Sequence, residues 1–260
     1  MTQARHSDGS AGDADYGRIG NSYSAYRQPD PKIAAQIHAA LGDAQTVLNV
    51  GAGAGSYEPL DREATAVEPS ASMRSQRPPH LPVAIDATAE NLPFSSAHFD
   101  ASMATFSVHQ WTDLSQGLGE MRRVTRGPVV ILSCDPTALE RYWLHEYAPE
   151  VTAVEAARYP SIGTITNALG GQVHIVPIAI PLDCRDGFNE AYYGRPEKLL
   201  DENARLACSG WSFVQPHAVE RFTQTQRRDL EAGAWDARFG HLRSQSRFEG
   251  PLRLIVANPS

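Results

Sequence analysis

Residues 46–56, TVLNVGAGAGS, decide the fold of this chain. The run 46–50 is β-branched and almost continuously apolar, which is typical of a strand buried on both faces of a sheet. It leads directly into the glycine turn 51–55, Gly-Ala-Gly-Ala-Gly. Glycines suit a tight strand-to-helix turn because it needs positive φ, and because a Cβ would hold the backbone away from a bound ligand. The stretch therefore predicts the first strand and the ligand loop of a parallel α/β sheet.

Similar apolar runs recur along the chain and predict further strands at 64–68 (ATAVE), 82–86 (PVAID), 99–106 (FDASMATF) and 128–133 (PVVILS). Helical periodicity predicts a helix that is capped by Asp30, has Pro31 at its first position and ends at Gly42. A second helix is expected over 113–126, with arginines in its last turn. Strands that alternate with helices favour an α/β fold with a Rossmann-like, doubly wound, mostly parallel sheet.

The pattern loosens after residue 135, and this change predicts the domain organisation. We expect a loose tail over 1–15, a core over 16–135, a cap over 136–250 and a last core strand within 251–260. The cap is expected to contain an aromatic-rich helix at 139–150, a helical stretch to Arg158, a β-like run at 171–182, and polar amphipathic helices at 188–207 and 219–240. Such a cap would lie over the carboxyl ends of the strands, where open α/β sheets bind ligands.

Composition excludes several classes of function. The 260 residues carry a formal charge of −7, with 23 Lys and Arg against 30 Asp and Glu, so a broad basic surface for nucleic acid is not expected. The longest apolar stretch, 173–182, is too short for a membrane span, and the N-terminus lacks the apolar region of a secretion signal. A cytoplasmic protein is therefore expected. Three cysteines at wide spacing predict neither a disulfide framework nor a metal site.

The nature of the ligand is indicated by an acidic residue behind the loop. Glu68 ends the next predicted strand, where its carboxylate would accept hydrogen bonds from both hydroxyls of a ribose. A dinucleotide fingerprint places its third glycine three residues after the second and continues into a helix that carries the pyrophosphate. Here Gly55 comes two residues after Gly53, Pro59 ends any helix quickly, and Glu58 would repel a diphosphate. A nucleoside ligand without phosphate fits better, and S-adenosylmethionine is the common one.

At this point the chain resembles the class I S-adenosylmethionine-dependent methyltransferases, in the branch of small bacterial enzymes of the methyltransferase type 11 kind. The resemblance covers residues 16–135 and rests on five motifs in the family order. These are the glycine loop at 50–55, VEPSASM at 67–73, AENLPF at 89–94, FDASMATFSVHQW at 99–111, and the helix ending at Arg126. It implies the cofactor S-adenosylmethionine, the product S-adenosylhomocysteine and no metal.

The resemblance also implies roles for individual residues. Those that would contact the cofactor are Gly51, Ala52, Gly53 and Gly55 at the methionine part, Glu68 at the ribose, Met73 against the adenine, Thr88 and the Ala89 amide at the adenine edge, and the Thr105 carbonyl at the amino group. Where the family often has an acidic residue before the Ala-Glu pair, this chain has Thr88, with Asp86 two residues earlier. Glu90 would cap or orient that loop. Tyr16, Tyr23 and Arg27 would fold over the cofactor, with a phenol at the sulfonium side and the guanidinium at the carboxylate.

Methyl transfer uses an activated donor, so the protein mainly supplies alignment, and a base is needed only if the acceptor arrives protonated. His109, just past the fourth strand, is the candidate base, because imidazole titrates near neutrality. The alternative is that it orients the loop or packs beside Trp111. Cap residues that would wall an acceptor pocket or simply pack are Tyr142, Trp143, His145, Tyr192, Tyr193 and Trp211, of which Trp143, Tyr193 and Trp211 are the substrate-binding candidates.

The cap favours a methyltransferase that acts on a small-molecule acceptor, in biosynthesis or secondary metabolism, because a methylase of large polymers would usually leave that face open. Methylation on O, N or C and the oligomeric state stay open. The alternatives are an RNA or protein methyltransferase, which the acidic charge disfavours, and a noncatalytic protein that binds S-adenosylmethionine or its product. A dehydrogenase is a more distant alternative.

Overall fold

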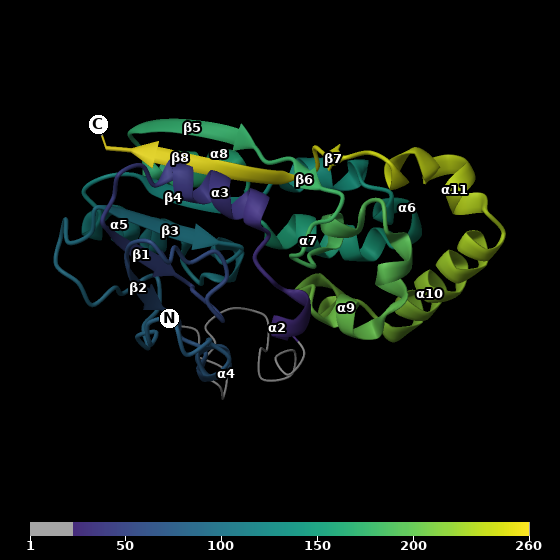
Figure 1. The fold of residues 1–260 in the computed structure, drawn as a ribbon, viewed down its shortest axis with the longest axis horizontal. Helices are drawn as coiled ribbons and strands as arrows, with labels where there is room; N and C mark the ends of the chain where they lie inside the picture. The colour runs from purple at the N-terminus through teal and green to yellow at the C-terminus, as the bar shows by residue number, and fades with distance from the viewer. Residues whose placement is uncertain (1–22, 260) are drawn as a thin grey trace.

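A computed structural model describes residues 23–259. Its centre is a six-stranded sheet, and a group of helices lies beyond one end of the sheet, so the molecule is elongated (Figure 1). The sheet strands are β1 (Thr46–Val50), β2 (Glu63–Val67), β3 (Ala101–Thr105), β4 (Val129–Cys134), β5 (Gln172–Pro177) and β8 (Leu252–Asn258). Two short strands, β6 (Ile180–Pro181) and β7 (Arg247–Phe248), pair separately.

The strand order is β2-β1-β3-β4-β8-β5. The pairs β1–β2, β1–β3 and β3–β4 are parallel, whereas β8 runs antiparallel to both β4 and β5. The chain thus moves from β1 to β2 on one side and then to β3 on the other. This reversal places a topological switch point at the carboxyl ends of β1 and β3, where sheets of this type bind ligands. The predicted doubly wound, mostly parallel sheet is confirmed.

Helices cover both faces of the sheet. Ile33 and Ile37 of α3 (Pro31–Ala40) pack with alternate strand residues such as Val47 on one face. Leu118 of α5 (Leu114–Val124) and Ile165 of α8 (Ile162–Leu169) pack on the other. As expected, the Asp30 side chain caps α3 by accepting hydrogen bonds from the Lys32 and Ile33 amides.

The helical group at the far end of the molecule faces the carboxyl ends of the parallel strands (Figure 1). It consists of α6 (Leu144–Tyr147), α7 (Pro149–Arg158), α9 (Glu202–Leu206), α10 (Pro216–Glu231), α11 (Ala234–Phe239) and the 3₁₀ helices η3 (Pro136–Arg141), η4 (Asn189–Tyr192), η5 (Pro196–Leu200), η6 (Ser209–Phe213) and η7 (Gly240–Arg243). The remaining short helices are α2 (Tyr23–Tyr26), α4 (Ala71–Ser75) and η2 (Val108–Gln110). Within 136–250, β5 is a strand of the sheet and α8 packs on its face, so these two elements lie apart from the helical group.

Four expected elements differ from the structure. The expected helix at 219–240 is divided into α10 and α11 at Gly233, which has positive φ. Residues 82–86 form no strand, because Pro82 offers no N–H and only Ile85 makes an isolated bridge to Val67. The expected helix at 139–150 is divided between η3 and α6, and Pro149 begins a new helix. The expected helix at 188–207 is likewise divided into η4, η5 and α9, since Pro196 starts a new turn.

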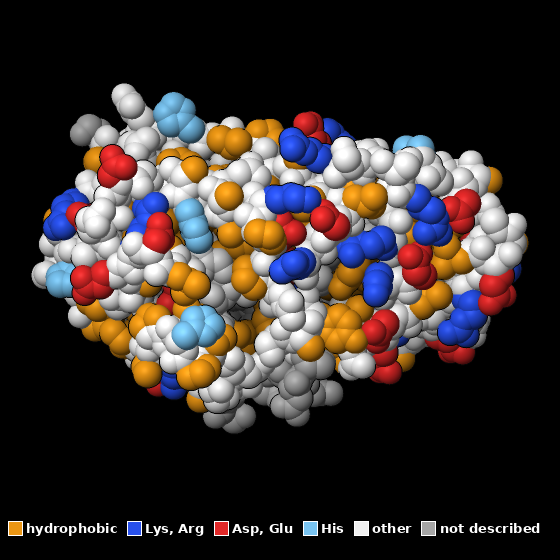
Figure 2. Space-filling model, in the orientation of Figure 1, with side chains coloured by type: hydrophobic (Ala, Val, Ile, Leu, Met, Phe, Trp, Pro, Cys, Tyr) orange, Lys and Arg blue, Asp and Glu red, His pale blue; other side chains and the backbone are white. Residues whose placement is uncertain are grey.

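The face of the molecule drawn in Figure 2 carries both positively and negatively charged side chains. Lys and Arg side chains alternate with Asp and Glu over the helical end, and no broad basic area is visible on the face drawn (Figure 2). Among residues 23–259, no helix has both the length and the apolar content needed to cross a membrane.

Candidate cofactor and acceptor site

The glycine loop after β1 bends as the sequence predicts. Gly51 has φ +68° and Gly53 has φ +52°, a conformation that L-residues with side chains rarely adopt. A Cβ on Gly51 would lie 2.6 Å from the Ser107 Cβ, so the loop packs closely against the end of β3. No helix follows within residues 51–62. The loop therefore lacks the helix N-terminus that would carry a pyrophosphate.

Glu58 does not play the role that the sequence suggested. Its carboxylate is buried and accepts hydrogen bonds from Arg77 Nη2 at 2.8 Å and from Asn49 Nδ2 at 3.1 Å. Glu58 does not line the loop cavity described below. The prediction that Glu58 repels a diphosphate is therefore wrong, because Arg77 neutralises its charge.

Glu68 follows β2 and is held under the loop. Its Oε2 accepts a hydrogen bond from the Gly53 amide at 2.8 Å, and its Oε1 accepts one from the Ser70 amide at 2.8 Å. A carboxylate has about four lone-pair positions, so each oxygen keeps one for a ligand. Burial raises the pKa of Glu68, and the two amide hydrogen bonds act in the opposite direction. The site thus offers a fixed pair of acceptors to two neighbouring hydroxyl groups.

A cavity, which we call the first cavity, lies between this loop and the ends of β2 and β3. Its lining includes Tyr23, Arg27, Gly51, Ala52, Gly53, Glu68, Met73, Thr88, Ala89, Glu90, Thr105, Phe106 and Trp111. Ten of the eleven residues expected at the cofactor are therefore brought together. Gly55 is the exception, because it faces a separate surface groove beside Leu81. Asp86 points elsewhere and pairs with Arg74 at 3.3 Å.

Two loop residues behave as supports. Glu90 Oε1 accepts hydrogen bonds from the Thr112 amide at 2.9 Å and the Asp113 amide at 3.2 Å. It thereby ties the 88–90 loop to the start of α5, which is the orienting role expected of it. Phe106, immediately after β3, has φ +51° although it is not glycine. Strained residues of this kind gather at functional sites, and this backbone signal is invisible in the sequence.

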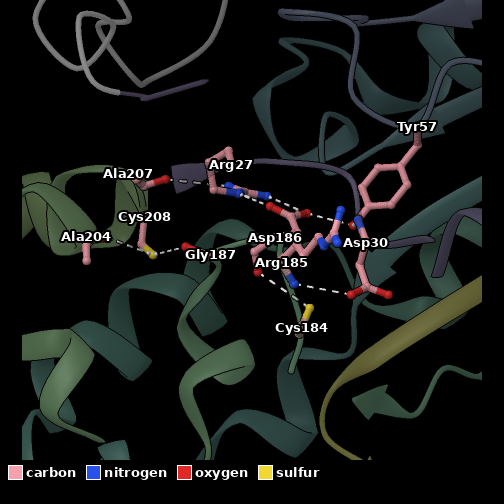
Figure 3. Close-up of polar contacts among 10 residues, drawn as sticks. All are labelled: Arg27, Asp30, Tyr57, Cys184, Arg185, Asp186, Gly187, Ala204, Ala207 and Cys208. Atoms are coloured by element: carbon pink, nitrogen blue, oxygen red, sulfur yellow. Dashed lines mark hydrogen bonds and ion pairs between the residues drawn. The ribbon is translucent and has the colours of Figure 1, made fainter. Parts of the chain in front are cut away.

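Arg27 occupies the wall between the sheet and the helical group. Its Nε donates to Asp186 Oδ1 at 2.5 Å and its Nη2 donates to Asp186 Oδ2 at 3.4 Å (Figure 3). Tyr57, from the glycine loop, donates its hydroxyl to the same carboxylate at 2.8 Å. The guanidinium expected at a cofactor carboxylate thus already has an anionic partner from the helical side. Tyr23 lines the first cavity beside it, and Tyr16 lies outside the described residues.

A second, smaller cavity adjoins the first. Tyr23, Arg27 and Phe106 line both. Its remaining lining comes from η2, β4 and the helical group, and consists of His109, Cys134, Glu155, Tyr159, Phe188, Asn189, Glu190, Ala207, Cys208 and Ser209. The second cavity therefore lies between the cofactor-type cavity and the helical group.

His109 lines this second cavity. Its ring lies 4.4 Å from the ring of Tyr159, measured between centroids. Burial, with the charges of Arg158 and Arg27, lowers the pKa of His109 well below its usual value. The imidazole is therefore neutral at physiological pH.

The three aromatic residues expected to bind substrate line neither cavity. Trp143 Nε1 donates to the Tyr193 carbonyl at 3.0 Å, and the Tyr193 hydroxyl donates to the Gln245 carbonyl at 2.5 Å. Trp211 Nε1 donates to Asn189 Oδ1 at 2.9 Å. All three are buried in the core of the helical group, where these hydrogen bonds satisfy their polar atoms.

Phe106, Glu155, Phe188 and Glu190 line the cavities but were not predicted from the sequence. Acidic residues within short helices usually point to solvent, so their burial follows from packing and not from any local pattern. All three cysteines are free and buried. Within the described part of the chain, no group of three or more His, Cys, Asp or Glu residues could hold a metal ion.

Comparison with known proteins agrees with this geometry. The family described as "Methyltransferase domain" matches residues 48–131, from β1 to β4. A crystal structure from Anabaena variabilis, assigned as a methyltransferase of an antibiotic biosynthesis pathway, is 27% identical with a TM-score of 0.83, covering 89% of this chain and 98% of its own. No curated protein sequence matches the chain.

Two more distant structures share the fold alone. One, from Thermotoga maritima, is described as an S-adenosylmethionine-dependent methyltransferase, possible histamine N-methyltransferase; it is 15% identical, with a TM-score of 0.52 and coverage of 94% and 98%. The other is the [4+2]-cyclase SpnF, at 12% identity, a TM-score of 0.52 and coverage of 94% and 93%.

A nucleoside-type cavity at the switch point of a doubly wound sheet defines a class I S-adenosylmethionine-binding fold. More particularly, residues 48–131 match the methyltransferase-domain family, and the chain is similar over 89% of its length to a structure assigned as a methyltransferase.

Proposed function

We propose that this protein transfers the methyl group of S-adenosylmethionine to a small-molecule acceptor in a biosynthetic pathway. The observation that carries the proposal is the adjoining pair of cavities, one formed by the glycine loop and Glu68, the other enclosed by the helical group. A small, enclosed acceptor space favours a discrete compound over a polymer. The Anabaena variabilis structure supports a biosynthetic role, since its similarity covers 89% of this chain.

In this proposal the first cavity holds the cofactor. Glu68 accepts hydrogen bonds from the two ribose hydroxyls with the lone pairs that Gly53 and Ser70 leave available. Met73, Thr88 and Ala89 contact the adenine, while Gly51, Ala52 and the Thr105 carbonyl contact the methionine part. Tyr23 and Arg27 close the side that faces the second cavity. Gly55 acts indirectly, by shaping the loop.

When bound, S-adenosylmethionine supplies a methyl group on a positively charged sulfur, and an acceptor that arrives protonated must lose a proton as it takes that group. We propose that His109 accepts this proton or a hydrogen bond from the acceptor. The neutral imidazole has the lone pair that either role needs. The wall of the second cavity excludes water and aligns the acceptor, and alignment alone contributes on the order of 7 to 11 kcal/mol in such reactions.

The test is turnover of methyl-labelled S-adenosylmethionine with a panel of small-molecule acceptors, bulk RNA and a protein mixture. The proposal expects label in small molecules only. Label in RNA or protein would show that the acceptor is a polymer and would overturn the proposed small-molecule acceptor. Binding of the cofactor without label in any acceptor across the panel would favour a noncatalytic binding protein.

A further inference from the structure

Two carboxylates reach the second cavity from different elements. Glu155 comes from the middle of α7 and Glu190 from η4. Glu155 is 8% exposed and Glu190 is 3% exposed, and both line the cavity. Acidic side chains are almost never this deeply buried without a partner, so the partners of each carboxylate decide what this cavity can hold.

Glu155 is held in place by its neighbours. Its Oε1 accepts a hydrogen bond from Asn189 Nδ2 at 3.0 Å, and Asn189 is fixed in turn by the indole of Trp211 at 2.9 Å. Gly210 leaves the space that Glu155 fills, because a Cβ there would lie 2.7 Å from the Glu155 Cγ. The structure is therefore arranged around this buried carboxylate.

Glu190 differs from Glu155 in its partners. Within residues 23–259, no side chain or amide of another residue donates a hydrogen bond to its carboxylate. Burial, followed by the charge of Glu155, raises the pKa of Glu190 to about 8, and Arg27 acts in the opposite direction. Arg27 itself is paired with Asp186. The carboxylate of Glu190 is thus a buried acceptor at the cavity wall to which only its own backbone amide donates among the described residues.

The rest of the wall combines aromatic and apolar residues with polar ones, namely His109, Asn189, Ser209 and the paired Arg27. The rings of Phe106 and Phe188 lie 5.3 Å apart between centroids, and Tyr159 completes this side. Aromatic faces attract cations as well as apolar groups. A ligand that suits this cavity therefore combines an apolar body with a positively charged or proton-donating group directed at Glu190.

We propose that the second cavity is the acceptor subsite and that it binds a small organic amine, with Glu190 and Glu155 as the anionic partners of the nitrogen. That the bound amine is the methyl acceptor rests on the proposed function. That the cavity binds an amine rests only on the residues that line it. A protonated amine would favour the ionised form of the two carboxylates, which burial otherwise disfavours. A hydroxyl compound would supply one hydrogen bond and no charge.

The test is calorimetric titration at neutral pH with three matched pairs of probes: methylamine and methanol, benzylamine and benzyl alcohol, 2-phenylethylamine and 2-phenylethanol. Each titration is run with and without S-adenosylhomocysteine. We expect at least one amine to bind about tenfold or more tightly than its alcohol, a difference of about 1.4 kcal/mol. If no amine binds better than its alcohol, the inference is overturned.

The Glu190→Gln variant identifies the carboxylate responsible, because glutamine keeps the size and removes the charge. It should weaken amine binding about tenfold while leaving alcohol and S-adenosylhomocysteine binding unchanged, and Glu155→Gln serves as the second variant. Glu231→Gln, at the exposed end of α10, is the matched control. Unchanged amine binding in both cavity variants would refute the inference. Absence of heat with S-adenosylhomocysteine would instead refute the proposed function, and the amine titrations without it remain a separate test.

Discussion

Arg27 and Asp186 form a buried ion pair that joins the segment before α3 to the helical group. Their side chains are 11% and 1% exposed, and the adjoining backbone pairs through the hydrogen bond from the Gly187 amide to the Tyr26 carbonyl at 2.9 Å. Since Arg27 lines both cavities, this pair positions a wall that the cofactor-type cavity and the acceptor-type cavity share.

The first prediction concerns this pair. Asp186→Asn leaves the Arg27 charge buried without its partner, so the free energy of unfolding should fall by about 3 kcal/mol or more. Asp183→Asn is the control, because Asp183 pairs with Lys32 at the surface and should cost less than about 1 kcal/mol. Denaturant unfolding measures both values. Equal effects of the two substitutions would show that the buried ion pair contributes no more to the free energy of unfolding than the surface pair.

A second prediction concerns the glycine loop. Gly51→Ala should reduce stability by about 1 to 3 kcal/mol and weaken cofactor binding, since the new Cβ meets Ser107 at a backbone position with positive φ. Gly119→Ala in α5 provides the contrast, because it meets no atom within 4 Å and should stabilise the helix by about 0.5 to 1 kcal/mol. Thermal unfolding and calorimetry test the pair of variants. A tolerated Gly51→Ala would contradict the close approach of the loop to the end of β3.

A third prediction follows from the raised pKa of Glu190. As pH rises from about 4.5 to about 8, the unfolded chain releases a proton that the folded chain retains, so this group makes the protein less stable at the alkaline end of the range. Glu190→Gln should remove part of that loss. The free energy of unfolding of the variant, relative to the wild type, should therefore increase by at least about 1.4 kcal/mol from pH 4.5 to pH 8, which corresponds to one pKa unit. Unfolding curves across this range should show the gain, whereas Glu231→Gln should follow the wild type. Parallel curves for Glu190→Gln and wild type would exclude a raised pKa.

A fourth prediction concerns His109. His109→Ala should lower turnover about 100-fold or more if the imidazole takes part in proton transfer, with S-adenosylhomocysteine affinity nearly unchanged. The exposed His174 on β5 provides the control substitution, His174→Ala, which should not change turnover. An unaffected rate in His109→Ala would reduce the residue to a packing partner of Tyr159.

The sequence predicted the parallel core well because its signals are local. The apolar run of β1, the glycines after it and the Asp30 cap each act within a few residues, and all were located correctly. The strand predicted at 82–86 is absent because an apolar run alone does not reveal whether Pro82 and its neighbours form hydrogen bonds with an adjacent strand.

The acceptor side was harder to predict because its residues meet only through packing. Trp143, Tyr193 and Trp211 looked like pocket residues, but their polar atoms bond within the helical group. Glu155 and Glu190 are buried by contacts between α7, η4 and η6, which are distant in the sequence. No periodicity marks either residue, so only the assembled structure places the two carboxylates in one cavity.

The most direct test of the central claim compares S-adenosylhomocysteine with NAD by calorimetry, in the wild type, in Glu68→Ala and in the Glu63→Ala control on the exposed start of β2. We predict that the wild type and Glu63→Ala bind S-adenosylhomocysteine equally, that Glu68→Ala binds it about tenfold or more weakly, and that NAD produces no heat. Tight binding of NAD without binding of S-adenosylhomocysteine would contradict the account.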